Sequence, residues 1–378
     1  MSSAPTLPSG ATQDERRSRM AWARIAEPDD HLARRLIMVY GVVDGLDIAR
    51  RGSAAGITGL SDRFQARLDA LDVDRDLVIA DRVGARVLVP GDSEWPLLVD
   101  DLEMPPWALW VQGRLDLQSA TRRSVAVVGA RASTAYGNAV ATEIAAGMAD
   151  RGFTVVSGGA FGIDASAHRA TLAVDGATIS VLACGVDRSY PAAHTQLLDQ
   201  IRRSGAVLSE MPPGSAPMRT RFLARNRIIA ALGAGTVLVE AGLRSGARKT
   251  VSDTVALKRP VGAVPGPVTS MISAGCHEEI RNERAVLVTD AAEVADLIGA
   301  IGDDLAPERH GRPRASDSLD DVAMRVWQSL PGSESGPMSV DRLTRVAGLG
   351  VMEALSALGR LDAAGQAQRK GSGWVRGQ

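Results

Sequence analysis

The spacing of apolar residues changes along the chain and divides it into five segments. Residues 1–18 are small, polar and rich in proline and glycine, which predicts a disordered N-terminus. In residues 19–85 apolar positions recur every three or four residues, which predicts a small helical domain. Residues 86–301 alternate short apolar runs with amphipathic stretches, and residues 302–318 form a polar linker. Residues 319–378 carry three helical patterns and then a hairpin pattern, which predicts a winged-helix-like domain.

The central segment has the alternation of an α/β fold. Its short apolar runs predict strands at Ser124–Val128, Thr154–Val156, Thr178–Ala183, Ala206–Leu208, Thr236–Val239, Val261–Val264 and Ala285–Val288. The amphipathic stretches between them predict helices at Tyr136–Asp150, Ile163–Val174, His194–Ser204, Arg225–Leu232, Thr250–Lys258 and Ala291–Ile301. Strands this apolar, separated by helices, predict a doubly wound, mostly parallel sheet with helices on both faces, an extended Rossmann-like fold.

Composition narrows the class of protein. The 378 residues are 45% apolar, enough for sizeable cores, and the formal net charge of −1 excludes a globally basic nucleic-acid binder while leaving room for a local basic cleft. With two cysteines, Cys184 and Cys276, we expect neither a disulfide framework nor a four-ligand zinc site. No apolar run reaches eighteen residues and the N-terminus lacks a signal core, so we expect a cytoplasmic protein with no membrane partner.

Two strand-to-helix turns are candidates for anion binding. The first predicted strand runs into Gly129, Arg131 and Ser133 before a helix, and combines permissive backbone, free helix amides and a guanidinium. The motif is not the dinucleotide fingerprint G-x-G-x-x-G, which disfavours NAD. An ordinary turn would use the same glycines.

The second predicted strand ends in a turn with more glycine. Three glycines fall within five residues, which favours a phosphate cradle. Asp164 in the following helix could cap that helix or hold Arg131 in place. The candidate binding residues here are Ser157, Gly158, Gly159, Phe161 and Gly162.

The most strongly charged stretch lies between Met211 and Thr250. Glu240 is its one acid, and its bases are Arg219, Arg221, Arg225, Arg227, Arg244, Arg248 and Lys249. Phe222 and Asn226 are interleaved with these bases, a combination typical of grooves that follow a single-stranded phosphate backbone. A solvated surface is the alternative. Phe161, Tyr190 and Phe222 are the candidate stacking rings.

Catalytic patterns are few. The chain has no H-E-x-x-H, no G-x-S-x-G and no Walker A motif, and Cys276 and His277 are sequence neighbours that would not face each other on a helix. We therefore expect no bond chemistry, no metal and no cofactor.

Seven motifs in this order resemble the DprA/Smf family of DNA-processing proteins. They span about 86–301 and are the stretch Gly129–Gly137, SGGAFGID (157–164), GVDRSYP (185–191), SEMPPG (209–214), FLARNRIIA (222–230), VEAGLRSG (239–246) and PGP (265–267). The helical N-terminus, of the SAM-like kind, and the winged-helix-like C-terminus fit the same family.

The resemblance implies a homodimer, formed through the Rossmann-like domain, that binds single-stranded DNA without ATP. Such proteins protect incoming DNA in natural transformation and load the recombinase RecA. The resemblance makes Arg131 the pocket arginine, assigns Ser157, Gly158 and Gly162 to the phosphate loop, and matches residues 225–227 to the family's R-N-R signature.

The chain departs from the family pattern in three places. His194 stands where the family often has asparagine, and the neighbouring alanines put no charge there. Gly275-Cys276-His277 replaces an asparagine-containing segment. Arg248 and Lys249 add charge to a run that is usually small and threonine-rich, so both join the candidate DNA contacts.

Two other functions stay open at this level. The same sheet with Glu240 and Arg225 is similar to enzymes that hydrolyse nucleoside monophosphates. A pure adaptor, with the Rossmann-like domain as a dimer scaffold, would not bind single strands at all.

Overall fold

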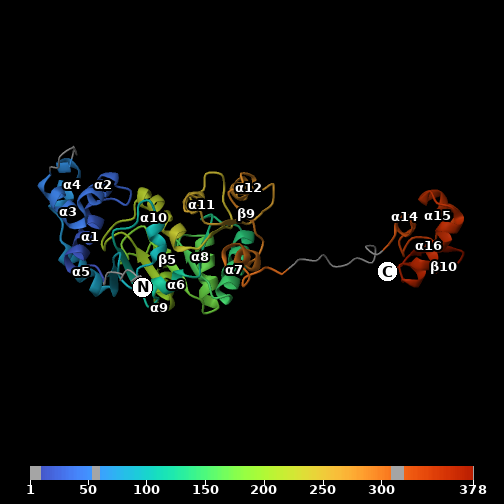
Figure 1. The fold of residues 1–378 in the computed structure, drawn as a ribbon. Helices are drawn as coiled ribbons and strands as arrows, with labels where there is room; N and C mark the ends of the chain where they lie inside the picture. Colours follow the sequence, from blue (N-terminus) through green and yellow to red (C-terminus); the bar gives the residue numbers. More distant parts are fainter. Residues whose placement is uncertain (1–9, 53–59, 308–318, 378) are drawn as a thin grey trace, which may run out of the picture. The chain divides into compact units, whose positions relative to one another are not determined.

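The computed structural model describes residues 10–52, 60–307 and 319–377. The chain forms two compact units, Met1–Ala306 and Pro307–Gln378 (Figure 1). Among the described residues, none of the helices is both long and apolar enough to cross a membrane.

In the described residues before the sheet the chain forms five helices: α1 (Gln13–Ile25), α2 (His31–Tyr40), α3 (Val42–Arg51), α4 (Leu60–Leu68) and α5 (Val73–Arg82). They pack around Trp22, Leu36 and Phe64, and the rings of Trp22 and Phe64 meet edge to face at 5.8 Å.

The prediction of a disordered segment through residue 18 is wrong from Thr12 onward. Thr12 caps α1 by accepting a hydrogen bond from the Glu15 amide, and Arg16 pairs with Asp92 and donates to the Val87 carbonyl. These contacts with residues far along the chain order a segment that is polar in composition.

A nine-stranded sheet forms the centre of the first unit, in the order β1-β2-β6-β5-β4-β3-β7-β8-β9. The strands from β3 to β9 are parallel, and β1 and β2 add an antiparallel edge beside β6, so the predicted mostly parallel, doubly wound fold is confirmed. The bounds are β1 Ala85–Leu88, β2 Leu109–Gly113, β3 Ser124–Val128, β4 Thr154–Ser157, β5 Thr178–Val181, β6 Ala206–Ser209, β7 Thr236–Leu238, β8 Val261–Ala263 and β9 Val286–Leu287.

Helices cover both faces of this sheet because alternate strand residues point to opposite sides. Val125 and Val127 of β3 face a core that includes α7 (Ala135–Asp150), α8 (Ile163–Ala173) and α13 (Ala291–Ile298). Ala126 and Val128 face the opposite core, which is built on α6 (Leu117–Thr121), α10 (Arg219–Leu232), α11 (Ala247–Ala256) and α12 (Ala274–Arg281). Helix α9 (Thr195–Ser204) packs beside α8 over β5 and β6.

The strand order reverses at β3. The chain winds outward in one direction through β4, β5 and β6, and then returns to place β7 on the other side of β3. Loops leaving the carboxyl ends of β3 and β7 therefore diverge, and the crevice between them is where open α/β sheets bind ligands.

The second unit has its own core. It contains α14 (Asp321–Ser329), α15 (Val340–Ala347), α16 (Val351–Ala363) and the hairpin of β10 (Ala367–Lys370) and β11 (Gly373–Arg376), the element order that the sequence predicts. Val326, Leu343 and Leu358 are fully buried between the helices.

Candidate functional site

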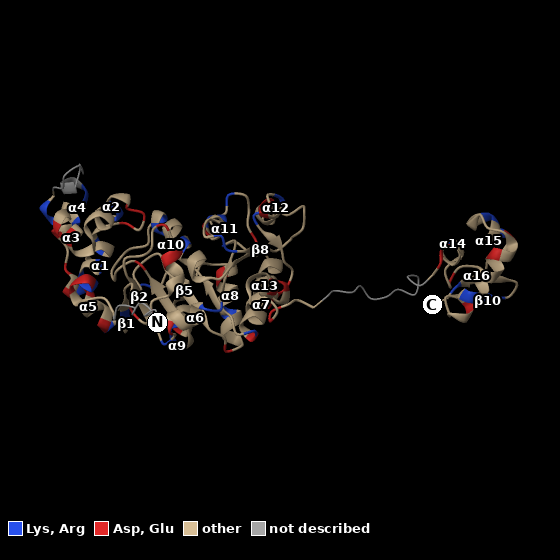
Figure 2. Cartoon of the chain, viewed as in Figure 1, with Lys and Arg blue, Asp and Glu red and all other residues tan. Residues whose placement is uncertain are grey.

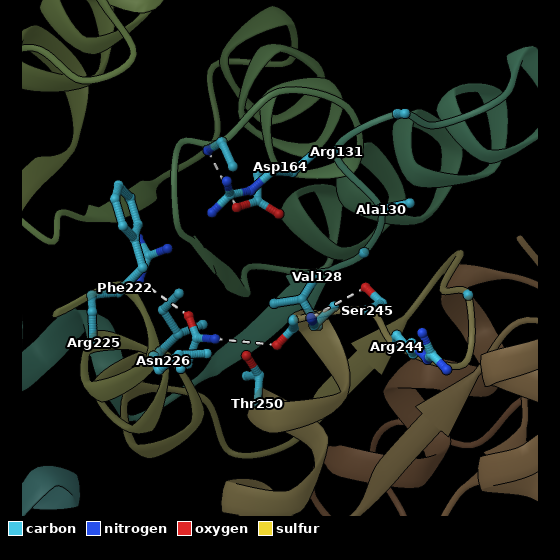
Figure 3. A pocket seen from close by; sticks show the side chains of 18 of the residues that line it. Val128, Ala130, Arg131, Asp164, Phe222, Arg225, Asn226, Arg244, Ser245 and Thr250 are labelled. Carbon is cyan, nitrogen blue, oxygen red and sulfur yellow. Dashed lines mark hydrogen bonds between the residues drawn. The ribbon is translucent and has the colours of Figure 1, made fainter. Parts of the chain in front are cut away.

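A pocket of about 520 Å³ opens in the crevice between β3 and β7 (Figure 3). Its walls come from the loop after β3, from α10 and from the loop between β7 and α11. Five residues predicted from the sequence line it: Gly129, Arg131, Phe222, Arg225 and Asn226. The structure therefore brings the first turn and the basic helix together at the reversal point of the sheet.

The N-terminus of α7 already holds an anion from the chain itself. Glu240, 2% exposed, accepts hydrogen bonds from the Thr134 amide (2.9 Å) and the Thr134 hydroxyl (2.6 Å). A Cβ at Gly137 would lie 2.1 Å from Glu240 Oε2, so this glycine makes room for the carboxylate. Glu240 therefore occupies the Thr134 amide at the start of α7, and anion binding by the other amides of this turn stays a prediction.

Among the candidate side chains of the first turn, Arg131 is the one free to contact an external anion. Ser133 donates its hydroxyl to Asn138 Oδ1 (2.6 Å), and Gly129 is required because a Cβ there would lie 2.6 Å from Ile163. Arg131 is exposed and forms no ion pair within the described part of the chain. Its guanidinium lies 5.3 Å from the centre of the Phe222 ring.

The glycine-rich turn after β4 is likewise braced from within. Asp164 accepts hydrogen bonds from the amides of Gly158 (3.1 Å) and Ala160 (3.3 Å), and the Ser157 hydroxyl donates to the Val127 carbonyl (2.7 Å). Asp164 and the Val127 carbonyl thus satisfy the amides of Gly158 and Ala160 and the Ser157 hydroxyl, and a phosphate cradle on the rest of this turn stays a prediction.

Arg225 holds this turn from the other side. Its guanidinium donates to the carbonyls of Gly158 (2.8 Å) and Val181, and a Cβ at Gly158 would clash with it at 2.6 Å. Burial lowers the pKa of Arg225 to about 10, although the negative charge of Asp164 acts to raise it. Burial also raises the pKa of Asp164. Arg225 thus acts as an internal brace whose side chain also forms part of the pocket wall.

The basic stretch is largely neutralised by acids that the sequence count could not place. Figure 2 shows basic and acidic residues interspersed through the unit. Two of its exposed bases, Arg219 and Arg244, form no ion pair with any described residue. The four paired side chains are Arg221 with Glu27 (2.9 Å), Arg227 with Glu210 (2.6 Å), Arg248 with Glu279 (2.6 Å) and Lys249 with Asp253.

Arg244 is the site residue that the sequence prediction missed. It lines the pocket on the side opposite Phe222 (Figure 3). Its charge was visible in the sequence, but nothing there distinguished it from neighbours that the fold pairs with acids.

Three exposed or half-buried rings flank the pocket on the α10 side. Phe222 contacts Tyr190 at 5.3 Å between ring centres, and Phe161 contacts His194 at 4.5 Å. We call Phe161, Tyr190 and Phe222 the aromatic rim. Asn226, next to Arg225, donates to the Gly246 carbonyl (3.2 Å) and ties α10 to the loop that carries Arg244.

The groups that a hydrolase would need are engaged elsewhere. Both Glu240 oxygens hold Thr134, and Glu240 is not part of the pocket wall. His168 is fully buried against Thr178, and burial lowers its pKa to about 3. Burial raises the pKa of Cys184 to about 11 and that of Cys276 to about 12. Within the described ranges no cluster of His, Cys, Asp or Glu could hold a metal ion.

Comparison with known proteins gives consistent matches. Residues 86–299 match the protein family described as DNA recombination-mediator protein A. The chain is 41% identical over 368 residues to a DNA processing protein, DprA, of Mycobacterium tuberculosis, covering 94% of this chain and 93% of the relative. It is 35% identical over 292 residues to Protein Smf of Escherichia coli, covering 76% of this chain and 77% of that protein.

Solved structures agree with these matches. The DprA structure from Streptococcus pneumoniae superposes with a TM-score of 0.64 and 30% identity, covering 76% of this chain and 99% of that chain. A Helicobacter pylori DprA structure, described in terms of its single-stranded DNA binding mode, superposes with a TM-score of 0.51 and 27% identity. The match covers 56% of this chain and 94% of that chain. The chain therefore belongs to the DprA/Smf family of DNA-processing proteins.

Proposed function

We propose that this chain binds single-stranded DNA across the pocket between β3 and β7. Arg131 and Arg244 would contact phosphates from opposite sides, and the aromatic rim would stack bases. The observation that carries the proposal is the contact between the Phe222 ring and an exposed Arg131 that has no ion-pair partner among the described residues, at the reversal point of the sheet. The single-stranded DNA binding described for the Helicobacter pylori relative supports it.

The remaining predicted residues would act behind this surface. Arg225 and the glycines of the second turn would hold its shape, since their donors and carbonyls bond to each other. Arg221, Arg227, Arg248 and Lys249 would add little to phosphate binding while their carboxylate partners stay in place.

The proposal includes a role in recombination without bond chemistry. The chain would protect single strands in the cytoplasm and help load RecA on them during DNA uptake. The description of its family as recombination mediators and the naming of its relatives as DNA-processing proteins support that role.

A homodimer through the Rossmann-like domain is part of the same proposal. Strand β9 pairs with β8 on one side only, and its residues Val286 and Leu287 are both exposed. An apolar edge strand is a surface that a second copy can cover. Sedimentation equilibrium of the intact protein measures the state directly.

Replacing Arg131 tests the DNA site. We expect Arg131→Ala to weaken binding of a fluorescent single-stranded oligonucleotide about tenfold, since a charge-assisted contact is lost. The slope of log K against log salt should become shallower by about 0.7, as for one phosphate contact on a single strand.

Arg122→Ala is the matched control, because Arg122 is an exposed arginine just before β3, at the opposite end of that strand. Equal affinities for Arg131→Ala and Arg122→Ala would refute the proposed site. Turnover of a nucleoside monophosphate by the intact protein would instead favour the hydrolase.

A further inference from the structure

Two loops on the far side of the pocket expose apolar side chains. Leu243, on the loop between β7 and α11, is 49% exposed. Val268 and Met271, on the loop between β8 and α12, are 91% and 76% exposed. Neither loop needs these side chains for the core, since they project from it.

The two loops form one surface beside the pocket. The Gly275 amide donates to the Ala241 carbonyl at 2.7 Å, and a Cβ at Gly242 would lie 3.6 Å from the Met271 carbonyl oxygen. Leu243 stands between two residues of the pocket wall, Gly242 and Arg244, and Met271 directly precedes a third, Ile272.

Tyr136 continues this surface from α7. Its hydroxyl donates to the Pro265 carbonyl at 2.6 Å, which holds the half-exposed ring against the start of the β8–α12 loop. We call Tyr136, Leu243, Val268 and Met271 the apolar rim.

The pocket thus presents charged and polar side chains on a mixed wall that lies between two apolar margins. Arg131, Arg244 and Asn226 line it (Figure 3). The aromatic rim adjoins the wall at Phe222 on α10, and the apolar rim adjoins it on the loops that follow β7 and β8. An extended single strand has the complementary arrangement, because each nucleotide joins a charged phosphate to a flat base with two apolar faces.

We propose that the apolar rim is a base-contact surface for single-stranded DNA, with phosphates turned toward Arg131 and Arg244 and bases turned outward onto Leu243, Val268 and Met271. This inference rests on the proposed function. Bases are favoured over a protein partner because Arg244 adjoins Leu243 in the chain, so a phosphate contact and an apolar contact fall within one residue of each other.

This arrangement has consequences for selectivity. Leu243, Val268 and Met271 offer no side-chain hydrogen bonds to base edges, so contact with them would not depend on base identity. A duplex keeps its base faces stacked inside the helix, so it could reach the arginines but not the rim. Single-strand preference would then come from the rim and salt dependence from the arginines.

The test compares Met271→Ser with Met352→Ser on two oligonucleotides. Met352 is the matched control because it is a methionine of similar exposure, 79%, in the separate C-terminal unit. The first oligonucleotide is a fluorescent thymidine 20-mer, and the second is a 20-mer of the same backbone charge with abasic sugars throughout. Thermal unfolding of each variant checks that the fold is intact.

We expect Met271→Ser to weaken binding of the thymidine oligomer by about three- to tenfold, an effect at or below that of losing a stacked base. The salt slope should stay unchanged, and binding of the abasic oligomer should equal that of wild type. Val268→Ser should behave in the same way, whereas Arg131→Ala should weaken binding of both oligomers and lower the slope.

Three results would overturn the inference. Met271→Ser could bind the thymidine oligomer as Met352→Ser does, it could lose affinity equally for both oligomers, or it could change the salt slope. Failure of the proposed function looks different, because wild type would then bind neither oligomer at low salt.

Discussion

Two arginines on the pocket wall have opposite environments. Arg225 is buried, its pKa is lowered to about 10 by that burial, and its donors reach the carbonyls of Gly158 and Val181. Arg131 is exposed and faces the Phe222 ring. A strongly hydrated external phosphate can replace water at Arg131, whereas at Arg225 it would have to displace satisfied carbonyl bonds. The two residues therefore differ in role although both belong to family motifs.

A buried histidine gives a prediction at this scale. Burial lowers the pKa of His168 to about 3 from 6.5, so below pH 6.5 the unfolded chain binds a proton that the folded chain does not. The free energy of unfolding should fall as pH drops from 6.5 toward 3, by up to about 1.4 kcal/mol per pH unit from this group.

His168→Asn keeps a polar partner for Thr178 and removes the titration. We expect its stability, measured by urea unfolding at pH 7 and pH 4.5, to depend less on pH than that of wild type. Equal pH dependence in the two proteins would mean that His168 binds a proton as readily in the folded chain as in the unfolded chain.

At the scale of elements, the strands follow directly from the sequence. Each parallel strand begins at the residue predicted for it or one residue later. Short apolar runs between helical patterns are typical of strands that helices bury on both faces of a sheet. What fills the helix N-termini was not predictable in the same way. Glu240 stands 106 residues after Thr134, and only the return of the chain from β6 to β7 brings it there.

The same limit applies to charge. The local excess of bases after Met211 is real in the sequence, but Glu27, on the segment between α1 and α2, stands 194 residues before Arg221. The pKa of Glu27 is lowered mainly by its hydrogen bond to Arg221, which indicates a stabilising interaction between the two elements. A count of charges within a sequence window cannot detect an acid contributed by a distant segment of the chain.

Glu240→Gln tests the assigned role of that carboxylate. A glutamine presents only one acceptor to the Thr134 amide and hydroxyl and removes the negative charge at the start of α7. We expect urea unfolding to show a loss of about 1–3 kcal/mol in the free energy of unfolding. Glu143→Gln, at an exposed position on the same helix, is the control and should lose less than about 0.5 kcal/mol. If Glu240→Gln were as stable as the control, the carboxylate would be free for another task, and the hydrolase would need testing.

For the whole molecule, the contacts divide the chain at one place. The N-terminal helices belong to the unit of the sheet: Arg24 donates to the Pro213 carbonyl at 2.8 Å, and Arg221 pairs with Glu27. The C-terminal unit instead buries its apolar residues among its own helices and hairpin, from Ala323 to Ala367. The proposed DNA surface lies wholly within the first unit.

Removing residues 307–378 should therefore leave the first unit folded and its proposed DNA site complete. We expect a chain ending at Ala306 to unfold within about 2 °C of the corresponding transition in the full chain, since no core residue of the first unit is removed. Its affinity for a single-stranded oligonucleotide should stay within about twofold, because Arg131, Arg244 and both rims are retained. Calorimetry and the same fluorescence titration measure the two quantities on one preparation. A loss of about tenfold or more with unchanged stability would mean that the C-terminal unit contacts the DNA itself.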